Sequence, residues 1–186
     1  MHRGFTLIEL LTTLAVVAAL AAIAAPPLLG FIQSARLRSA ANTLQADFQL
    51  ARREAIKRNQ PVLVCPVGAA GTPLVCGTNW TLGWMICYRV QGTTSATASD
   101  FNQCDSPVSA DDPNPFVKRA ALESTLVATG LPTTAPFVRF NANGSQGVQN
   151  STTGLSFTLK GSWANSKVYT WTIPPPGNIS MVISEP

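Results

Sequence analysis

The fold is decided by the sequence Gly4-Phe5-Thr6-Leu7-Ile8-Glu9-Leu10 and by the apolar stretch that continues from it, LLTTLAVVAALAAIAAPPLLGFI (residues 10–32). No charged residue occurs between Glu9 and Arg36. A helix rises about 1.5 Å per residue, so a stretch of this length crosses a hydrocarbon core of about 30 Å. We therefore predict a transmembrane helix over residues 5–32.

Glu9 lies inside this apolar sequence, where an ionised carboxylate is costly. The cost is about 2.5 to 3.5 kcal/mol at mid-membrane depth and is smaller near the interface. A cleaved secretory signal, with Arg3 as its basic start and Ala-rich cleavage sites, explains the apolar stretch but not the acid. The carboxylate therefore requires a cationic partner.

Residues 4–10 resemble the processing signature of type IV prepilins and pseudopilins. The resemblance implies that prepilin peptidase cuts between Gly4 and Phe5, that residues 1–4 are a leader, and that Phe5 becomes N-methylated. It also implies that Glu9 pairs with the N-terminal amine of a neighbouring subunit during assembly, which supplies the missing cation. The expected location is the bacterial inner membrane, single-pass with a periplasmic head, and then a pilus or pseudopilus.

Beyond the apolar stretch, small and apolar side chains recur every three or four residues, which is the spacing of one helical face. They are Leu37, Ala41, Leu44, Phe48, Ala51 and Ala55. Pro61 disfavours helical geometry at Gln60, so an amphipathic stem helix is predicted over residues 33–59. Residues 50–62, LARREAIKRNQPV, resemble the end of this helix in the GspH/FimT family of minor pilins and pseudopilins.

Residues 60–186 contain short β-branched and aromatic segments separated by Gly, Pro, Asn and Ser, which predicts a β-rich head. Within it, Gly83-Trp84 and the Asn143-Gly144 turn resemble motifs of the same family. The predicted fold class is therefore α+β. The resemblance implies a pilin fold, in which a long N-terminal helix, membrane-spanning in its first half, packs on a C-terminal antiparallel β-sheet head. A long exposed loop is expected over residues 92–115. The predicted strands are Val62–Cys65, Thr81–Val90, Val117–Leu122, Thr125–Ala128, Phe137–Asn141, Ser156–Leu159, Tyr169–Ile173 and Ile179–Ile183.

All four cysteines, Cys65, Cys76, Cys87 and Cys104, fall in the head, which the predicted topology places in the oxidising periplasm. One or two disulfides are expected, and four cysteines allow three pairings. Short loops favour Cys65 with Cys76 and Cys87 with Cys104. A zinc site is not expected, because the gaps of 11, 11 and 17 residues contain no CxxC motif.

No catalytic site, metal site or cofactor is expected, and the chain is interpreted as a non-enzyme. Its single histidine is His2, so the head has no imidazole to act as a general base. Acidic residues gather in the predicted loop, but without an alternating Asp-x-Asp pattern they are interpreted as a solvated acidic loop rather than a calcium site. They are Asp100, Asp105, Asp111 and Asp112.

The charge distribution bears on DNA as a partner. Charged residues are only 12% of the chain, which argues against a nucleic-acid-coating protein. The stem has six basic and two acidic residues, whereas the head has six of each. Some FimT relatives are implicated in DNA uptake through a Gly-Arg-x-Arg pattern, for which this chain has Gly177-Asn178-Ile179-Ser180. DNA binding, which the charge disfavours, would therefore require folding to gather other residues. The candidates are Arg89, Lys118, Arg119 and Arg139, with Trp80 or Trp84 to stack on bases.

The sequence is best interpreted as a minor pilin or pseudopilin that joins an initiation or tip complex of a type IV pilus or a type II secretion pseudopilus. The expected partners are prepilin peptidase, other minor subunits, the major pilin and the inner membrane. Two alternatives stay open: a DNA-binding minor pilin that acts in DNA uptake during natural transformation, and an ordinary secreted domain released by signal peptidase.

Overall fold

The computed structural model describes residues 6–68, 75–88, 104, 113–130, 137–147 and 154–185, and of residues 22–28 it describes the backbone alone. The chain divides into two compact units, Met1–Arg36 and Leu37–Pro186, and each is considered by itself. Helix α1 (Leu7–Arg58) contributes residues to both units.

In the first unit, α1 carries large apolar side chains that are exposed; Leu7 is 77% exposed and Phe31 is 72% exposed. Within the described ranges, no helix combines the length and the apolar character needed to span a bilayer. The predicted span over residues 5–32 includes residue 5 and the side chains of residues 22–28, which lie outside the described residues. The membrane-spanning first half therefore stays a prediction.

Helix α1 ends at Arg58, close to the predicted end of the stem. Asn59 adopts a left-handed conformation with a φ of 52°. Its amide donates to the Ile56 carbonyl at 3.3 Å, and the amide of Gln60 donates to the Ala55 carbonyl at 3.2 Å. These two bonds satisfy carbonyls of the last helical turn, as in a Schellman motif, and redirect the chain into the first strand.

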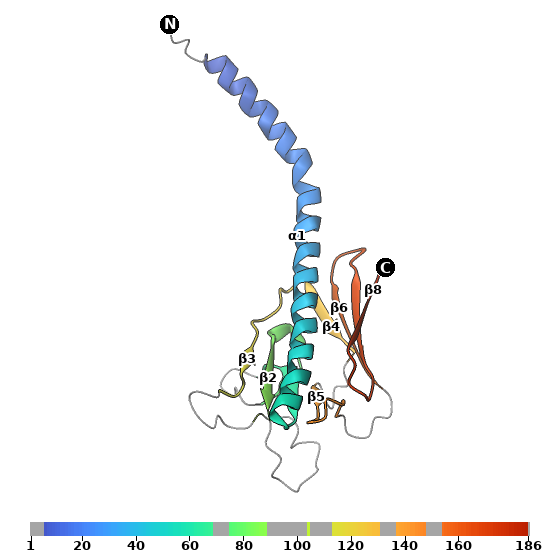
Figure 1. Ribbon diagram of the computed structural model, residues 1–186. Helices are drawn as coiled ribbons and strands as arrows, with labels where there is room; N and C mark the ends of the chain where they lie inside the picture. The colour runs from blue at the N-terminus through green and yellow to red at the C-terminus, as the bar shows by residue number, and fades with distance from the viewer. Residues whose placement is uncertain are drawn as a thin grey trace. The chain divides into compact units, whose positions relative to one another are not determined.

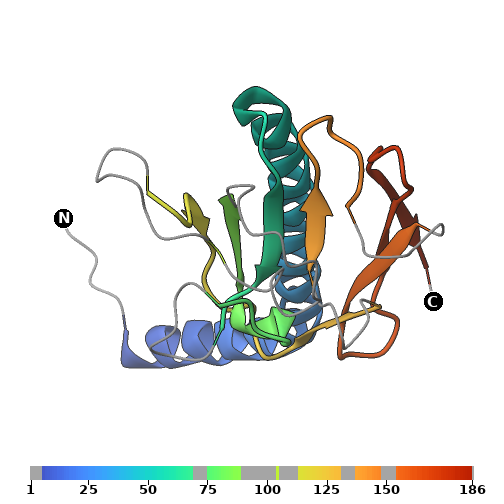
Figure 2. The same ribbon diagram turned by 90° about the horizontal axis from the view of Figure 1, so that it is seen from below.

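The second unit contains two antiparallel sheets of four strands each. In Figure 1, β2 and β3 lie to one side of α1 and β6 and β8 to the other, and Figure 2 keeps this separation. The first sheet has the order β3-β2-β1-β5 and consists of β1 (Val62–Pro66), β2 (Trp84–Tyr88), β3 (Val117–Lys118) and β5 (Val138–Phe140). The second has the order β4-β6-β7-β8 and consists of β4 (Leu126–Thr129), β6 (Leu155–Gly161), β7 (Val168–Ile173) and β8 (Ser180–Ser184).

One face of α1 packs against the head, as the spacing of its apolar residues predicts, and in the structure it contacts both sheets. All six side chains of the predicted face are buried in one core that includes residues of both sheets. Phe48 has its ring 6.4 Å from each of the rings of Trp80, Phe157 and Trp171, in edge-on geometry. Such pairs contribute about 0.5–1.5 kcal/mol each beyond area burial. The stem helix is therefore an integral part of the head's core.

The predicted strand Thr81–Val90 begins later than expected. Residues Trp80–Leu82 form a short 3₁₀ turn, η1, because the Asn79 side chain accepts a hydrogen bond from the Thr81 amide at 2.9 Å. Gly83 follows with a φ of 95° and redirects the chain before β2. Residues 89–90 lie outside the described residues.

The predicted strand Val117–Leu122 is also shorter, because pairing of β3 with β2 ends at Lys118. The next amide, of Arg119, donates to the Trp84 carbonyl at 2.8 Å. The other predicted strands form to within two residues of their expected ends. The predicted loop over residues 92–115 is described only at residue 104 and from residue 113 onward.

Candidate functional site

Thr6 and Glu9 form the start of α1. The Thr6 hydroxyl accepts a hydrogen bond from the Glu9 amide at 3.3 Å, and the Thr6 carbonyl accepts one from the Leu10 amide at 3.2 Å. Threonine followed three residues later by glutamate is the sequence of a capping box, and a carboxylate in the first turn is favoured by the helix dipole. Glu9 therefore has a favourable local setting apart from its predicted role in assembly. Gly4 and Phe5, the predicted cleavage and methylation positions, lie outside the described residues.

The exposed apolar residues of the first unit are the largest such group among the described residues. Exposed apolar area is unfavourable in water by about 25 cal/mol per Å², and contiguous exposed apolar surface marks interaction sites. This surface is therefore a candidate interaction site. Its residues are Leu7, Ile8, Leu10, Leu11, Leu14, Val16, Val17, Leu20, Leu29, Phe31 and Ile32.

A buried carboxylate joins α1 to the first sheet. Asp47 is 1% exposed and accepts a hydrogen bond from the Trp84 indole nitrogen at 2.8 Å. The Arg119 guanidinium donates to both carboxylate oxygens, from Nε and Nη2, at 2.9 Å each. Bidentate pairing fixes orientation as well as distance, so Asp47 holds α1 against β2 and against the residue that follows β3.

The hydrogen bond to Asp47 raises the pKa of Arg119 above its ordinary value, burial opposes the rise, and the coulombic attraction of Asp47 adds to it. The guanidinium is therefore charged throughout the physiological range, and its charge is directed at the carboxylate. A phosphate would have to compete with Asp47 for this predicted DNA contact.

The structure does not bring together Lys118 and Arg139, the two other candidate DNA contacts that it describes. Lys118 on β3 and Arg139 on β5 lie at opposite edges of the first sheet, with β1 and β2 between them. Neighbouring strands are about 4.8 Å apart, so three strand spacings separate these edges. Arg89 lies outside the described residues. Trp80 and Trp84 are buried in the core, which removes them as base-stacking residues.

Arg52 brings together two turns that belong to different sheets. Its Nε donates to the Gly144 carbonyl at 3.0 Å, and its Nη2 donates to the Pro176 carbonyl at 3.4 Å. Gly144 and Gly177 have φ values of 77° and 82°, a conformation that favours glycine. A Cβ atom at Gly177 would collide with the Gly144 carbonyl oxygen. The Asn143-Gly144 motif and Gly177 therefore form a single junction on α1.

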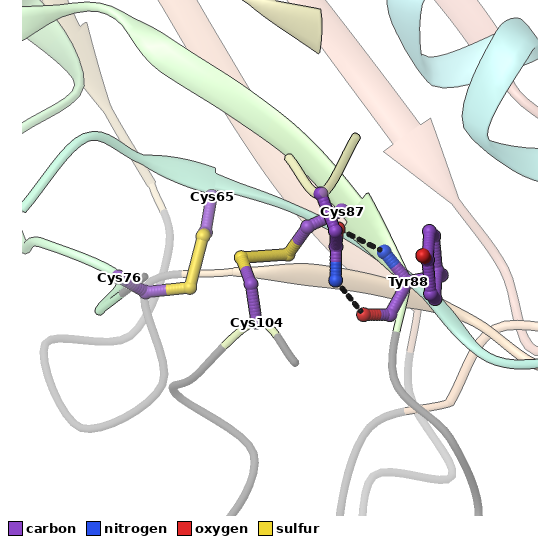
Figure 3. The surroundings of a disulfide bond; sticks show 6 residues. Cys65, Cys76, Cys87, Tyr88 and Cys104 are labelled. Atoms are coloured by element: carbon purple, nitrogen blue, oxygen red, sulfur yellow. Dashed lines mark hydrogen bonds between the residues drawn. A yellow bond between two sulfur atoms is a disulfide. The ribbon is translucent and has the colours of Figure 1, made fainter. Parts of the chain in front are cut away.

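Both disulfides cover the face of the first sheet opposite its core face (Figure 3). The structure joins Cys65 to Cys76 and Cys87 to Cys104, the pairing that short loops favour. Successive residues of a strand point to opposite faces of the sheet. The residues of β1 and β2 that point away from the main core therefore form a second apolar cluster on the other face. Its buried residues are Leu63, Cys65, Met85, Cys87, Cys104 and Phe137.

Asn114 closes the base of the segment between β2 and β3. Its buried side chain accepts a hydrogen bond from the Tyr88 amide at 3.1 Å and donates one to the Tyr88 carbonyl at 2.8 Å, marked by dashed lines at Tyr88 in Figure 3. The Phe116 amide then donates to the Ile86 carbonyl at 3.1 Å. The segment therefore leaves and rejoins β2 at one place.

The four aspartates of the predicted acidic loop lie outside the described residues, so their interpretation stays a prediction. In the part of the chain that the structure describes, no group of three or more His, Cys, Asp or Glu residues is arranged to hold a metal ion. All four cysteine sulfurs are in disulfides, so they cannot serve as the thiolate ligands of a zinc site.

The sequence does not predict the structural roles of Asp47, Arg52 and Asn114. Asp47 does leave a signal, because it is an acid directly before Phe48 on the apolar face, where a charge is tolerated only with partners. Arg52 and Asn114 bond to backbone groups far along the chain, and such contacts leave no local pattern in the sequence.

A long N-terminal helix with an exposed apolar first part, packed farther along on an antiparallel β head, defines the class of type IV pilins and pseudopilins. Within this class the chain belongs to the family described as type II transport protein GspH, which matches residues 40–175. The prokaryotic N-terminal methylation motif matches residues 1–25.

Solved structures of one pilin have the same fold. The type IV minor pilin FimU of Pseudomonas aeruginosa strain PAO1, crystallised in space group P21, is 20% identical, with a TM-score of 0.55 over 84% of this chain and 96% of FimU. The crystal form in space group P65 gives 20% identity and a TM-score of 0.52 over 80% and 96%. At this identity the likeness supports the fold alone. No curated protein matches this chain by sequence.

Proposed function

We propose that this chain is a structural, non-enzymatic subunit that joins an initiation or tip complex of a type IV pilus or a type II secretion pseudopilus. The observation that carries the proposal is the division of apolar residues along α1. The six side chains of the predicted face, from Leu37 to Ala55, are buried in the chain's own head, whereas the described large apolar side chains between Leu7 and Ile32 are exposed. A helix that completes its own head and leaves a second apolar surface uncovered is suited to a subunit held first by lipid and then by its neighbours.

In this proposal, prepilin peptidase cuts between Gly4 and Phe5 and Phe5 is methylated. The apolar part of α1 then anchors the chain in the inner membrane with its head in the periplasm. Two disulfides support an oxidising location for the head. On assembly, the Glu9 carboxylate pairs with the N-terminal amine of a neighbouring subunit as α1 leaves the bilayer.

The first experiment is deletion of the gene, with the intact gene restored as the control. Surface pili are counted by electron microscopy, and secreted enzymes are assayed in parallel. Loss of pili would assign the chain to a pilus, and loss of secretion with unchanged pili would assign it to a pseudopilus. No change in either measurement would contradict the proposal.

A second experiment restores the gene as Glu9→Leu or as Glu54→Gln. Glu9→Leu should insert into the membrane and fail to assemble, because it removes the carboxylate but keeps the segment apolar. Glu54→Gln is the matched control, since Glu54 forms ion pairs with Lys57 and Arg58 of the same helix. Normal incorporation of the Glu9 variant would exclude the proposed role of its carboxylate.

DNA uptake is the alternative function and has less support. Non-specific DNA affinity comes mainly from several cations that neutralise phosphates together. Among the described candidates, Arg119 is engaged by Asp47, and Lys118 and Arg139 lie on opposite sheet edges. Retardation of duplex DNA by the full-length chain at low salt would reinstate this alternative.

A further inference from the structure

A groove of about 260 Å³ lies along α1 beside the segment that leads into β8. Its lining consists of Gln49, Arg52 and Arg53 from α1 and Ile179 from the segment before β8. Two adjacent guanidinium groups, one amide and one apolar side chain thus surround a space that is large enough for one side chain. This combination is complementary to an acidic side chain, whose methylene groups are apolar and whose end is charged.

Arg52 is held in place before any ligand arrives. Two of its N–H groups are used by the Gly144 and Pro176 carbonyls, and a guanidinium has five N–H donors, so three stay available. Carbonyl partners fix the position of the group without neutralising its charge. The ordering cost that a flexible surface arginine would incur on binding is thereby reduced.

Neither groove arginine has a carboxylate partner within the described ranges. The two acidic residues of the stem form ion pairs with other basic residues. Asp47 pairs with Arg119, and Glu54 pairs with Lys57 and Arg58. Two uncompensated positive charges next to each other repel, and an added anion would relieve that repulsion. The groove therefore has an excess of positive charge that the described part of the chain does not balance.

We propose that this groove binds one aspartate or glutamate side chain of a neighbouring subunit. Arg52 is the fixed donor, Arg53 the second donor, and Ile179 contacts the methylene groups of the incoming side chain. The proposal rests on the proposed assembly function and names the contact through which one partner docks. A protein carboxylate is favoured over a DNA backbone because the groove has room for one anionic group, whereas DNA binding requires a row of cations.

The test is co-purification of the other minor subunits with the full-length, affinity-tagged chain from detergent-solubilised membranes. Arg53→Glu should lower the amount of co-purified subunit about tenfold, because like charges then oppose each other across the contact. Arg53→Gln should lower it by about threefold. Lys57→Glu, with the same charge change one turn farther on but outside the groove lining, should leave it unchanged. A thermal unfolding midpoint equal to the wild type's will show that each variant is folded.

A compensating substitution in the partner subunit identifies the acidic side chain that binds in the groove. An Asp→Lys or Glu→Lys change in the co-purifying subunit should restore binding to Arg53→Glu and weaken binding to the wild type. Wild-type co-purification by Arg53→Glu would overturn the groove contact while leaving the proposed function intact. Absence of any minor subunit with the wild-type chain would contradict the proposed function, and the groove contact with it.

A DNA-binding assay tests the alternative ligand of the groove, a phosphate group of the DNA backbone. Each variant, in neutral detergent, is mixed at low salt with a short duplex of random sequence in a shift assay. We expect any retardation to be equal for wild type, Arg53→Glu and Lys57→Glu. Retardation lost only in Arg53→Glu, with co-purification unchanged, would overturn the proposal and assign the groove to nucleic acid.

Discussion

At the scale of single residues, the clearest prediction concerns the contribution of Asp47 to stability. Asp47→Ala removes the acceptor of the buried Trp84 indole and the counter-charge of Arg119. The free energy of unfolding should fall by about 1–3 kcal/mol, the cost of leaving the buried indole donor without a partner. The loss stays below that of a fully buried ion pair because the Arg119 side chain is 44% exposed and water can solvate it. Urea unfolding followed by tryptophan fluorescence measures the change.

The control for Asp47 is Lys167→Ala, which removes the exposed pair between Lys167 and Glu185. Its effect should stay within about 0.5 kcal/mol. Equal effects of Asp47→Ala and Lys167→Ala would contradict the structural role of Asp47.

The pair between Asp47 and Arg119 also predicts how stability depends on pH. A group with a raised pKa contributes stability at every pH below its ordinary value, and the contribution is lost only as pH rises through the raised value. The contribution of charged Arg119 to the free energy of unfolding should therefore be constant through neutral pH.

The two glycines at the Arg52 junction should differ in their response to alanine. Gly177→Ala places a Cβ against the backbone carbonyl of Gly144, which cannot move aside easily, and should cost about 2 kcal/mol or more. Gly144→Ala meets the flexible end of Ile56 at 2.8 Å and should cost about 1 kcal/mol, mainly from its positive φ. Thermal unfolding of the two variants shows which one loses more stability. A larger loss for Gly144→Ala than for Gly177→Ala would contradict the packing of these turns.

At the scale of elements, the disulfides stabilise loops and also cover a sheet face. Replacing Cys65 and Cys76, or Cys87 and Cys104, by serine should lower the free energy of unfolding by about 3 kcal/mol in each case. The loops of 11 and 17 residues differ too little for loop entropy to separate the two. Denaturant titration of each variant measures the loss.

Loss of the disulfide cover should also expose Leu63, Met85 and Phe137. Binding of a fluorescent apolar dye should therefore rise in both double-serine variants at temperatures below unfolding. Gly30→Ala is a suitable comparison, because a Cβ at Gly30 meets nothing within 4 Å. Dye binding equal to that of the wild type would mean that this face stays covered without the disulfides.

The sequence predicted individual elements better than their pairing. The face of α1 and the helix end at Arg58 are local, since they follow from apolar spacing and from Asn59-Gln60-Pro61. The division of the head into two sheets is not local, because β1 pairs with the distant β5 and β4 pairs with β6. For the same reason, the sequence indicates Arg52 only as one of the basic residues of the stem, and it does not predict the separate positions of Lys118 and Arg139.

At the scale of the whole molecule, processing is the step that precedes every other. Gly4→Val should block cleavage, so the chain should keep residues 1–4 and lack methylation at Phe5. Intact-mass spectrometry of the chain purified from its own bacterium measures both changes at once. Gly30→Val is the matched control, because it makes the same substitution farther along the same apolar segment. Normal cleavage of the Gly4 variant would exclude the predicted site.

The hydrogen bonds of Asn114 have a practical consequence for imaging. The segment between Tyr88 and Asn114 begins and ends at one point of β2, so added residues there need not disturb the strands. Each doubling of the length of a flexible loop costs only about 0.6 kcal/mol of closure entropy. An epitope inserted in it, away from Cys104 and its disulfide to Cys87, should label the head for microscopy while the helix and both sheets keep their structure.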